Sequence, residues 1–454
     1  MKKKYICMVL ALTLIFGSAV NTFGASTSSN NSVTANTTTA SAITATSSAI
    51  TTTSGGAVSA VTDGAITTTT PAIEGVTLPQ LTDTKTLSLA DAIKIMKTTG
   101  ASAETADLHK QSDIAVGKGY SETVSKIKKT QDNLDALSEA PDSWVQANYG
   151  ESVVQMAYDA QVAGVTSNNK KVMQLRRDFA KDNTENNYQA ELNQIEADTT
   201  SLYYKVLLAQ DKFKIAQDNL TSQKKTLQNV EAKKAAGMLS KKDVLQAESA
   251  VADAESEVRS AETQMKYAKM SFNYLLGYNV QQNVVFTDSL ETVAAAAEIE
   301  SADKAVQNAL NNRIELKGAN FAINVYQILF NDVSIYPKNS STYLNAKINL
   351  AESQKTAKDA YSKIEIDVRN KYDLVQDKRA AVAAAKDLLT YATEGERLVE
   401  LTNEEGMSTV EELLATQVSV YKAKLNLANA NSEYAIALKN YDFAQGVGTT
   451  RISL

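Results

Sequence analysis

The chain has 454 residues, of which 43% are hydrophobic but only 6% aromatic, and it contains 4 Pro and 18 Gly. This shortage of turn-forming residues and of large core side chains indicates long helices. The 46 basic and 52 acidic residues give a net charge of −6, and no basic stripe with interleaved aromatic residues is present, so nucleic acid is excluded as an expected partner.

The first 25 residues predict a secretory signal peptide. Three lysines, Lys2–Lys4, precede an apolar run, Ile6–Phe16, and small residues follow up to Ala25. The run is too short for a membrane-spanning helix, and no other run reaches the roughly 18 uncharged apolar residues that such a helix needs. The only cysteine, Cys7, lies in the apolar run, so the exported protein is expected to have no thiol, disulfide or Cys-based metal site.

Residues 26–86 consist mainly of Thr, Ser, Ala, Asn and Gly. Such a segment buries too little apolar surface to offset its ordering entropy, so a disordered leader is expected. A glycosylated stalk is the alternative.

Two helical repeats are expected to follow, over residues 87–290 and 291–446, with a short tail at 447–454. Each repeat begins with a leading helix. In the first repeat, Ser88 can cap a helix that starts within Leu87–Ile93, and Asp91 suits the positive end of that helix. A related start recurs at Ser301–Val306.

The later part of each repeat matches the other without a gap at a fixed offset of 169 residues. The offset between the leading helices is instead 213, measured from Ala92 to Ala305, so the first repeat has about 44 additional residues, mainly at 138–170. The matched pairs include Tyr203 with Tyr372, Gly237 with Gly406 and Gly277 with Gly446.

Apolar residues in the matched part recur with heptad spacing, which predicts an all-α fold of long antiparallel coiled-coil helices. Alanines on one side of the seam would let neighbouring backbones approach closely. A packed core explains these positions, so no chemistry is assigned to them. A helix from about Lys171 to Ala236 would be roughly 100 Å long, and one copy would leave two flanks exposed for further copies. The seam residues include Val244, Val251, Val258, Met265 and Phe272, with Ala247, Ala254, Ala261, Ala268 and Leu275.

Two tight turns join the paired helices, at residues 235–243 and 404–412. In each turn a glycine just past the helix end, Gly237 or Gly406, can take the left-handed conformation that closes the helix. Ser240 or Thr409 can then cap the next helix, with an acidic residue three positions later. The turns either only reverse the chain or form a docking tip.

With these turns, the chain resembles the TolC-type outer-membrane efflux proteins from Leu87 to Gly446. Members of that family are homotrimers in which the doubled helical unit builds a hollow cylinder. The cylinder docks a periplasmic adaptor protein at its inner end and carries a β-barrel at its outer end. The resemblance is carried by Leu87–Ile93, Tyr203–Tyr204, Leu207–Gln210, Ala236–Ala250, Asn273–Gly277, Ala309–Leu316 and Glu405–Ala430.

The resemblance implies that the two turns dock the adaptor. It also implies that Glu412 lies at the inner aperture, where three copies would form a carboxylate ring that favours cations; a helix-capping acid is the alternative. The chain departs from the family at Ala415 and Ser408, where an acidic and a basic residue are expected, so the charged lock at the entrance is weak or absent. The implied docking residues are Gly237, Met238, Ser240, Asp243, Gly406, Met407 and Thr409.

A larger departure concerns the membrane strands, each of which needs about 9 to 11 residues of alternating apolar and polar character. The residues around Pro337 are too few for such a hairpin, and residues 152–163 have helical spacing. The β-barrel is therefore expected to be absent or vestigial. The resemblance places the exported protein in an outer membrane, and a position in or on the cell wall without membrane insertion fits equally well.

The leading hypothesis is a non-enzymatic, trimeric efflux duct that works with an adaptor protein. The alternative is an envelope coiled-coil protein with a structural or interaction role and no transport. The sequence contains no catalytic triad, metal-ligand cluster or phosphate-binding glycine loop, and its single histidine, His109, is expected on a helix surface. Catalytic residues, metals and cofactors are therefore not expected.

Overall fold

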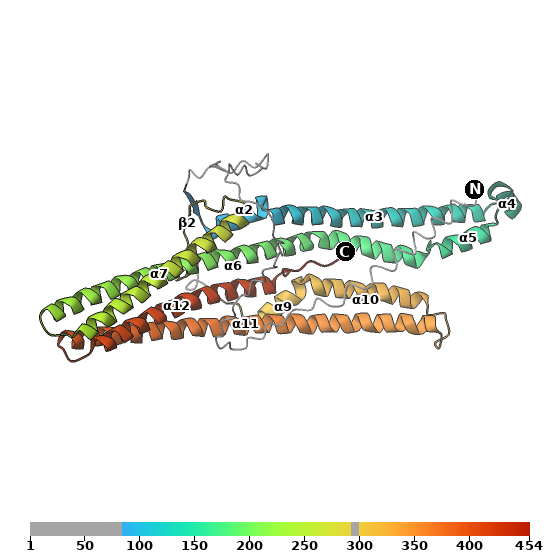
Figure 1. Ribbon diagram of the computed structural model, residues 1–454. Coiled ribbons are helices and arrows are strands. Elements are labelled where there is room, and N and C mark those ends of the chain that lie inside the picture. The colour runs from blue at the N-terminus through green and yellow to red at the C-terminus, as the bar shows by residue number, and fades with distance from the viewer. Residues whose placement is uncertain (1–83, 292–298) are drawn as a thin grey trace, which may run out of the picture. The chain divides into compact units, whose positions relative to one another are not determined.

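The computed structural model describes residues 84–291 and 299–454. The predicted signal peptide and residues 26–83 of the predicted leader lie outside the described residues. The described part is almost entirely helical, as the sequence predicted (Figure 1). Its strands are β1 (Lys85–Leu87) and β2 (Val284–Phe286), and its helices are α2 (Leu89–Thr99), α3 (Ala101–Ser138), α4 (Asp142–Tyr149), α5 (Val153–Val162), α6 (Ser167–Ala235), α7 (Lys241–Leu275), α9 (Ala302–Asn312), α10 (Ile314–Asp332), α11 (Ser341–Glu404) and α12 (Val410–Gln445).

Two pairs of long helices, α6 with α7 and α11 with α12, form the main body of the described chain. Helix α6 has 69 residues, which corresponds to about 100 Å at 1.5 Å per residue. Its sequence contains no Gly or Pro that would interrupt the helix. Its start is fixed by Thr166, whose side chain accepts a hydrogen bond from the Asn169 N–H at 3.0 Å.

Each leading helix is broken in two, which the sequence analysis did not predict. Gly100 separates α2 from α3, and Arg313 separates α9 from α10, both with extended backbone angles. A Cβ at Gly100 would lie 2.7 Å from the Met96 carbonyl oxygen, so a side chain at this position would force the backbone to shift. The Ser88 cap forms as predicted, with its Oγ accepting from the Asp91 N–H, whereas Ser301 precedes α9 without a side-chain cap.

The two connections between leading and paired helices differ as the sequence predicted. In the first repeat, residues 139–166 form α4 and α5, and the Ser152 side chain caps α5 by accepting from the Gln155 N–H at 3.2 Å. In the second repeat, residues 333–340, which include Pro337, join α10 directly to α11. The spacing in residues 152–163 therefore correctly indicated helix.

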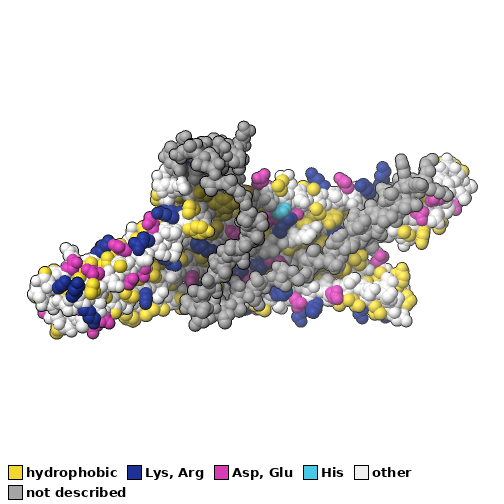
Figure 2. All heavy atoms as spheres, viewed as in Figure 1, with side chains coloured by type: hydrophobic (Ala, Val, Ile, Leu, Met, Phe, Trp, Pro, Cys, Tyr) yellow, Lys and Arg dark blue, Asp and Glu magenta, His cyan; other side chains and the backbone are white. Residues whose placement is uncertain are grey.

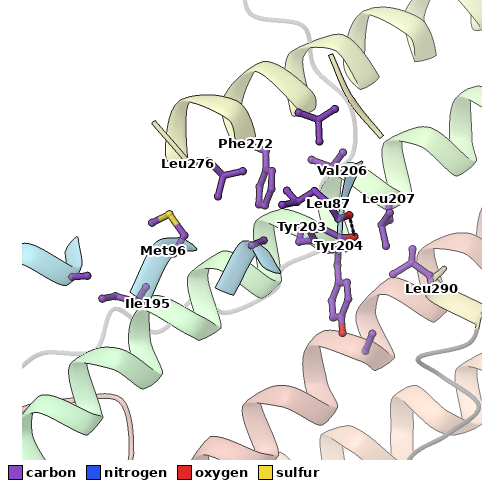
Figure 3. Close-up of a cluster of buried hydrophobic side chains, with 14 residues drawn as sticks. Leu87, Met96, Ile195, Tyr203, Tyr204, Val206, Leu207, Phe272, Leu276 and Leu290 are labelled. Carbon is purple, nitrogen blue, oxygen red and sulfur yellow. Dashed lines mark hydrogen bonds between the residues drawn. The ribbon is translucent and has the colours of Figure 1, made fainter. Parts of the chain in front are cut away.

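Buried side chains of α2, α6, α7 and the two strands form the core of the first repeat (Figure 3). Tyr203 lies at its centre: its ring packs edge-on against Phe272 at 5.7 Å, and its hydroxyl donates to the Leu87 carbonyl and to Asp288. Strand β1 pairs in parallel with β2, with Leu87 opposite Phe286. The Tyr203 hydroxyl therefore ties this small sheet to α6.

The second repeat has a separate core of α9, α11 and α12. Here Tyr372 and Tyr441, which follow Tyr203 and Phe272 by 169 residues, form the equivalent ring pair at 5.8 Å. The correspondence fails at the end of the paired helices: Gly277 has a left-handed φ of +71°, but in the second repeat Gly448, not Gly446, has the left-handed φ.

The C-terminal segment after α12 lies against α3 and α6. The guanidinium of Arg451 bridges Asp113 and Glu191 at 2.7 and 3.1 Å. The Asn187 side chain accepts from the Ile452 N–H and donates to its carbonyl, both at 2.9 Å. Because Asp113 and Asn187 are buried, these bonds fix the C-terminal segment to the first repeat.

We expect Phe272→Ala to lower the free energy of unfolding by about 3–5 kcal/mol, since it opens a cavity beside Tyr203 in a fully buried position. Phe272→Leu, which retains most of the side-chain volume, should cost clearly less. Urea unfolding at constant protein concentration measures both variants. Equal losses would contradict the packing described for this core.

Candidate functional site: the paired turns

The first turn closes α6 with a left-handed glycine. Gly237 has a φ of +76°. The Gly237 and Met238 N–H groups donate to the carbonyls of Lys234 and Lys233, both at 2.9 Å. These two bonds satisfy carbonyls that the helix end would otherwise leave unpaired, as in a Schellman motif.

The second turn closes α11 in the same way. Gly406 has a φ of +73°. Its N–H donates to the Asn403 carbonyl at 3.2 Å, and the Met407 N–H donates to the Thr402 carbonyl at 2.8 Å. The predicted left-handed conformation is therefore confirmed at both glycines.

Each turn continues into a complete capping box, which confirms the predicted caps. In the first turn, the Ser240 N–H donates to an Asp243 carboxylate oxygen at 2.8 Å, and the Asp243 N–H donates back to Ser240 Oγ. In the second, the Thr409 N–H donates to a Glu412 oxygen at 2.9 Å, and the Glu412 N–H donates to Thr409 Oγ1. Hydrogen bonds from the Ser240 side chain and backbone lower the pKa of Asp243.

The two turns differ at the residue after the methionine. In the first turn this residue is Leu239, which packs against an apolar cluster at the turn ends of α6, α7 and α12. In the second it is Ser408, whose hydroxyl donates to the Val399 carbonyl and accepts from Thr402, each at 3.0 Å. Apolar packing therefore holds the first turn and a hydroxyl network the second.

The turns lie side by side at one end of the paired helices (Figure 1). Lys233, in the last turn of α6, donates to the carbonyl and the side-chain oxygen of Asn403 at 2.7 and 3.0 Å. Val410, the first residue of α12, is buried in the same apolar cluster as Val230 and Val244. A cation at the carbonyl end of α11 is also favoured by the helix dipole.

Met238 and Met407 occupy matching positions in the two turns and are 73% and 75% exposed. Methionine side chains are flexible and polarizable, which suits a contact surface that adapts to a partner. Around them, acidic and basic side chains are intermixed on the visible face (Figure 2). The turns thus present two matching apolar side chains on a mixed-charge surface.

Sequence reasoning identified the glycines and caps but missed the contact between the turns. Lys233 and Asn403 are not matched at the 169-residue offset, so the alignment of the repeats gave no sign of their bond. The sequence analysis likewise assigned no packing role to Leu239. A long cationic side chain in the last turn of a helix was the available signal for a carbonyl contact.

The described residues offer little support for other kinds of site. His109 is partly exposed on α3 and lies 2.9 Å from Glu191, so it belongs to the contacts around the C-terminal segment. Across residues 84–291 and 299–454, no three His, Cys, Asp or Glu side chains are grouped as a metal site would require. No helix within these ranges has both the length and the apolar character for crossing a membrane.

Comparison with known proteins places the fold. No family model matches the chain, and no curated protein sequence matches it. Among solved structures, the open-state outer membrane channel MtrE of Neisseria gonorrhoeae is 13% identical, with 80% of this chain and 91% of that chain covered and a TM-score of 0.55. The outer membrane protein VceC of Vibrio cholerae is 12% identical, with 80% and 96% covered and a TM-score of 0.54.

A third structure, CusC, is 13% identical, with 62% of this chain and 74% of that chain covered and a TM-score of 0.52. At such low identities the likeness concerns the fold alone. The chain has the fold of TolC-type outer-membrane efflux channels, as the sequence predicted. Its described residues supply the long-helix architecture of that fold.

We expect Gly237→Ala to destabilise the first turn by about 1–2 kcal/mol, because alanine disfavours the left-handed conformation. Gly119→Ala is the matched control: it lies within α3, where a Cβ would meet nothing within 4 Å. The control should stabilise the protein by about 0.5–1 kcal/mol. Hydrogen exchange of residues 227–250 measures the local effect at the turn, and urea unfolding the global one. Faster exchange is expected only in Gly237→Ala.

Proposed function

We propose that this protein is a non-enzymatic duct component of an export system in the cell envelope. The observation that carries the proposal is the pair of turns with matching geometry at one end of a fold shared with outer-membrane channels. A conduit needs a wall and a docking end. In this chain the long helices would form the wall, and the paired turns would form the docking end. Solutes would pass without chemical change.

The wall would be built from three copies. Helices α7 and α11 lie at opposite edges of the layer formed by the paired helices, since α6 and α12 lie between them. Both edges expose large apolar side chains that no other described part of the chain covers. On α7 they are Leu245, Tyr267, Met270 and Tyr274, and on α11 they are Leu374, Leu388, Tyr391, Leu398 and Leu401.

The docking end would be the paired turns, with Gly237, Ser240 and Asp243 in one and Gly406 and Thr409 in the other. Closed helix ends and complete capping boxes make these turns rigid, and rigidity lowers the entropy lost on binding. The exposed Met238 and Met407 would supply the apolar contact to an adaptor protein. Neighbouring copies would repeat the pair around the end of the cylinder.

Glu412 would lie near the aperture of such a cylinder. One of its carboxylate oxygens accepts the Thr409 N–H, so the capping role that the sequence left open is observed. Capping leaves the negative charge in place, and three copies would still present three carboxylates to passing ions. Ala415 is exposed and adds no second carboxylate.

The purified exported protein is expected to be a trimer in solution and to conduct ions in planar bilayers. The double variant Leu388→Asp with Tyr391→Asp should lose the trimer, because it places charges in the α11 edge. Thr390→Asp, off that apolar stripe, is the matched control and should assemble normally. Mass in solution and single-channel recording are the measurements.

A monomeric wild type would contradict the proposed assembly. A trimer without conductance would contradict the duct and favour an envelope protein with a structural role.

Docking is tested by pull-down with a purified periplasmic adaptor protein of an export system. The double variant Gly237→Pro with Gly406→Pro should lose binding, because proline cannot adopt a left-handed φ. Met238→Ser with Met407→Ser keeps the backbone and should weaken binding through lost apolar contact. Binding equal to that of wild type in both variants would refute the docking role.

A further inference from the structure

Residues 139–166, between α3 and α6, form a segment that we call the arm. The arm contains α4 and α5. It packs on the long helices through the contact of α5 with α3 and through Val165, which lies against a cluster that includes Ile127 and Val172. Val154, Tyr158 and Val162 are spaced four residues apart, so they share one face of α5. They are 75%, 61% and 62% exposed. The arm therefore presents an unpaired apolar stripe.

The charge of the arm restricts what can cover that stripe. The arm contains no Lys or Arg, and its charged residues are Glu139, Asp142, Glu151 and Asp159. An anionic lipid surface is disfavoured, because such surfaces attract basic segments. Contact between two arms is also disfavoured, because each arm carries only acidic charges and these would repel one another. The composition of the arm therefore favours a partner surface that is apolar and has basic residues around it.

The chain carries such a surface at residues 333–348, which we call the basic corner. Ile335, in the connection between α10 and α11, is 85% exposed, and Leu344 and Ile348 form an exposed stripe on α11. Lys338 and Lys347 are exposed beside them. No acidic residue occurs between Asp332 and Glu352, so the basic corner is complementary to the arm in both charge and apolar character.

The arm and the basic corner lie at the same end of the helices but at opposite edges. Asn168 donates to Asp332 at 2.6 Å, which places the start of α6 level with the end of α10. In this half of the described chain the helices follow one another in the order α3, α6, α10, α11 (Figure 1). The arm lies on α3 at one edge, and the basic corner belongs to α11 at the other.

Apolar and acidic side chains are visible around α4 and α5 in Figure 2. Surfaces that are complementary but lie on opposite edges fit a head-to-tail contact between copies, which closes into a ring when the rotation allows.

We infer that the arm of one copy docks on the basic corner of the next copy. The inference rests on the proposed trimer and adds a specific contact to it, at the end away from the Gly237 and Gly406 turns. The stripe of Val154, Tyr158 and Val162 covers Ile335 and the α11 stripe, and Asp159 lies near Lys338. Each copy thus contributes an arm to one neighbour and a basic corner to the other.

Cross-linking between differently tagged chains tests this contact, on a Cys7→Ser background that leaves no other thiol. One chain carries Tyr158→Cys and the other carries Ile335→Cys. Oxidation of the mixed oligomer should produce a disulfide between the two kinds of chain. Replacing Ile335→Cys by Met238→Cys, which is also well exposed but lies in the turn at the opposite end, should abolish the product. Asp159→Lys should weaken cross-linking, and adding Lys338→Asp should restore it.

The outcomes separate this inference from the proposed function. A trimer that gives no product between Tyr158→Cys and Ile335→Cys overturns the inference and leaves the duct standing, whereas a monomer overturns the proposed assembly itself. Cross-linking of Tyr158→Cys chains to one another overturns the inference, because it shows arms meeting arms. Flotation with phosphatidylcholine vesicles that is lost in Val154→Ser with Tyr158→Ser also overturns it, because lipid then covers the stripe.

Discussion

The seam between the two helices of each pair is the interaction on which the described structure depends. The hydrogen bonds within a helix make an isolated helix only marginally stable in water. Most of the stability of these long helices therefore comes from packing along one stripe. In α7 and α12 the stripe contains small residues, such as Ala247, Ala254, Ala423 and Ala437, all of them buried. Small side chains let the backbones approach, and larger residues such as Phe272 and Tyr441 fill the space at the far end of each pair. The seam therefore aligns the two helices of each pair, and the turn connects them.

The same geometry creates the unpaired edges. Within residues 84–291 and 299–454, the four long helices pack side by side as a layer, which buries the faces of the inner helices and leaves α7 and α11 with helical partners on one side only. The described helices therefore leave both edges of the layer uncovered. Exposed patches of aromatic and aliphatic side chains are characteristic of interaction surfaces. The exposed edges are therefore a consequence of packing the helices as one layer, and they are the surfaces through which copies would meet in the proposed wall.

The sequence predicted those features that depend on residues close together in the chain. The left-handed Gly237 and Gly406, the caps at Ser240 and Thr409 and the helix after Ser152 all follow from local patterns, and the structure has each of them. The breaks at Gly100 and Arg313 were missed, because the helical pattern continues across them and only packing of the leading helices decides where they bend. The shift of the last left-handed glycine to Gly448 was missed for a related reason: Asn193 donates to the Gly448 carbonyl from a distant helix. Contacts between repeats have no local signature.

Both apolar and polar contacts join the two repeats. Val410 packs with Val230 and Val244 at the turns, and Val325 packs with Ile127 and Val172 in the other half of the helices. Lys233 bonds to Asn403 at the turns, and Gln417 donates to Thr226 further along the seam between α12 and α6. Glu196 pairs with both Lys97 and Lys439; burial alone would raise its pKa, but the two lysines outweigh burial and lower it. Polar partners can exchange one hydrogen bond for another or for water at a small net cost, whereas separating an apolar core loses its full burial energy. Because apolar clusters cross the boundary between repeats, separating the repeats would lose burial energy as well as hydrogen bonds, and the two pairs of helices are held as one layer.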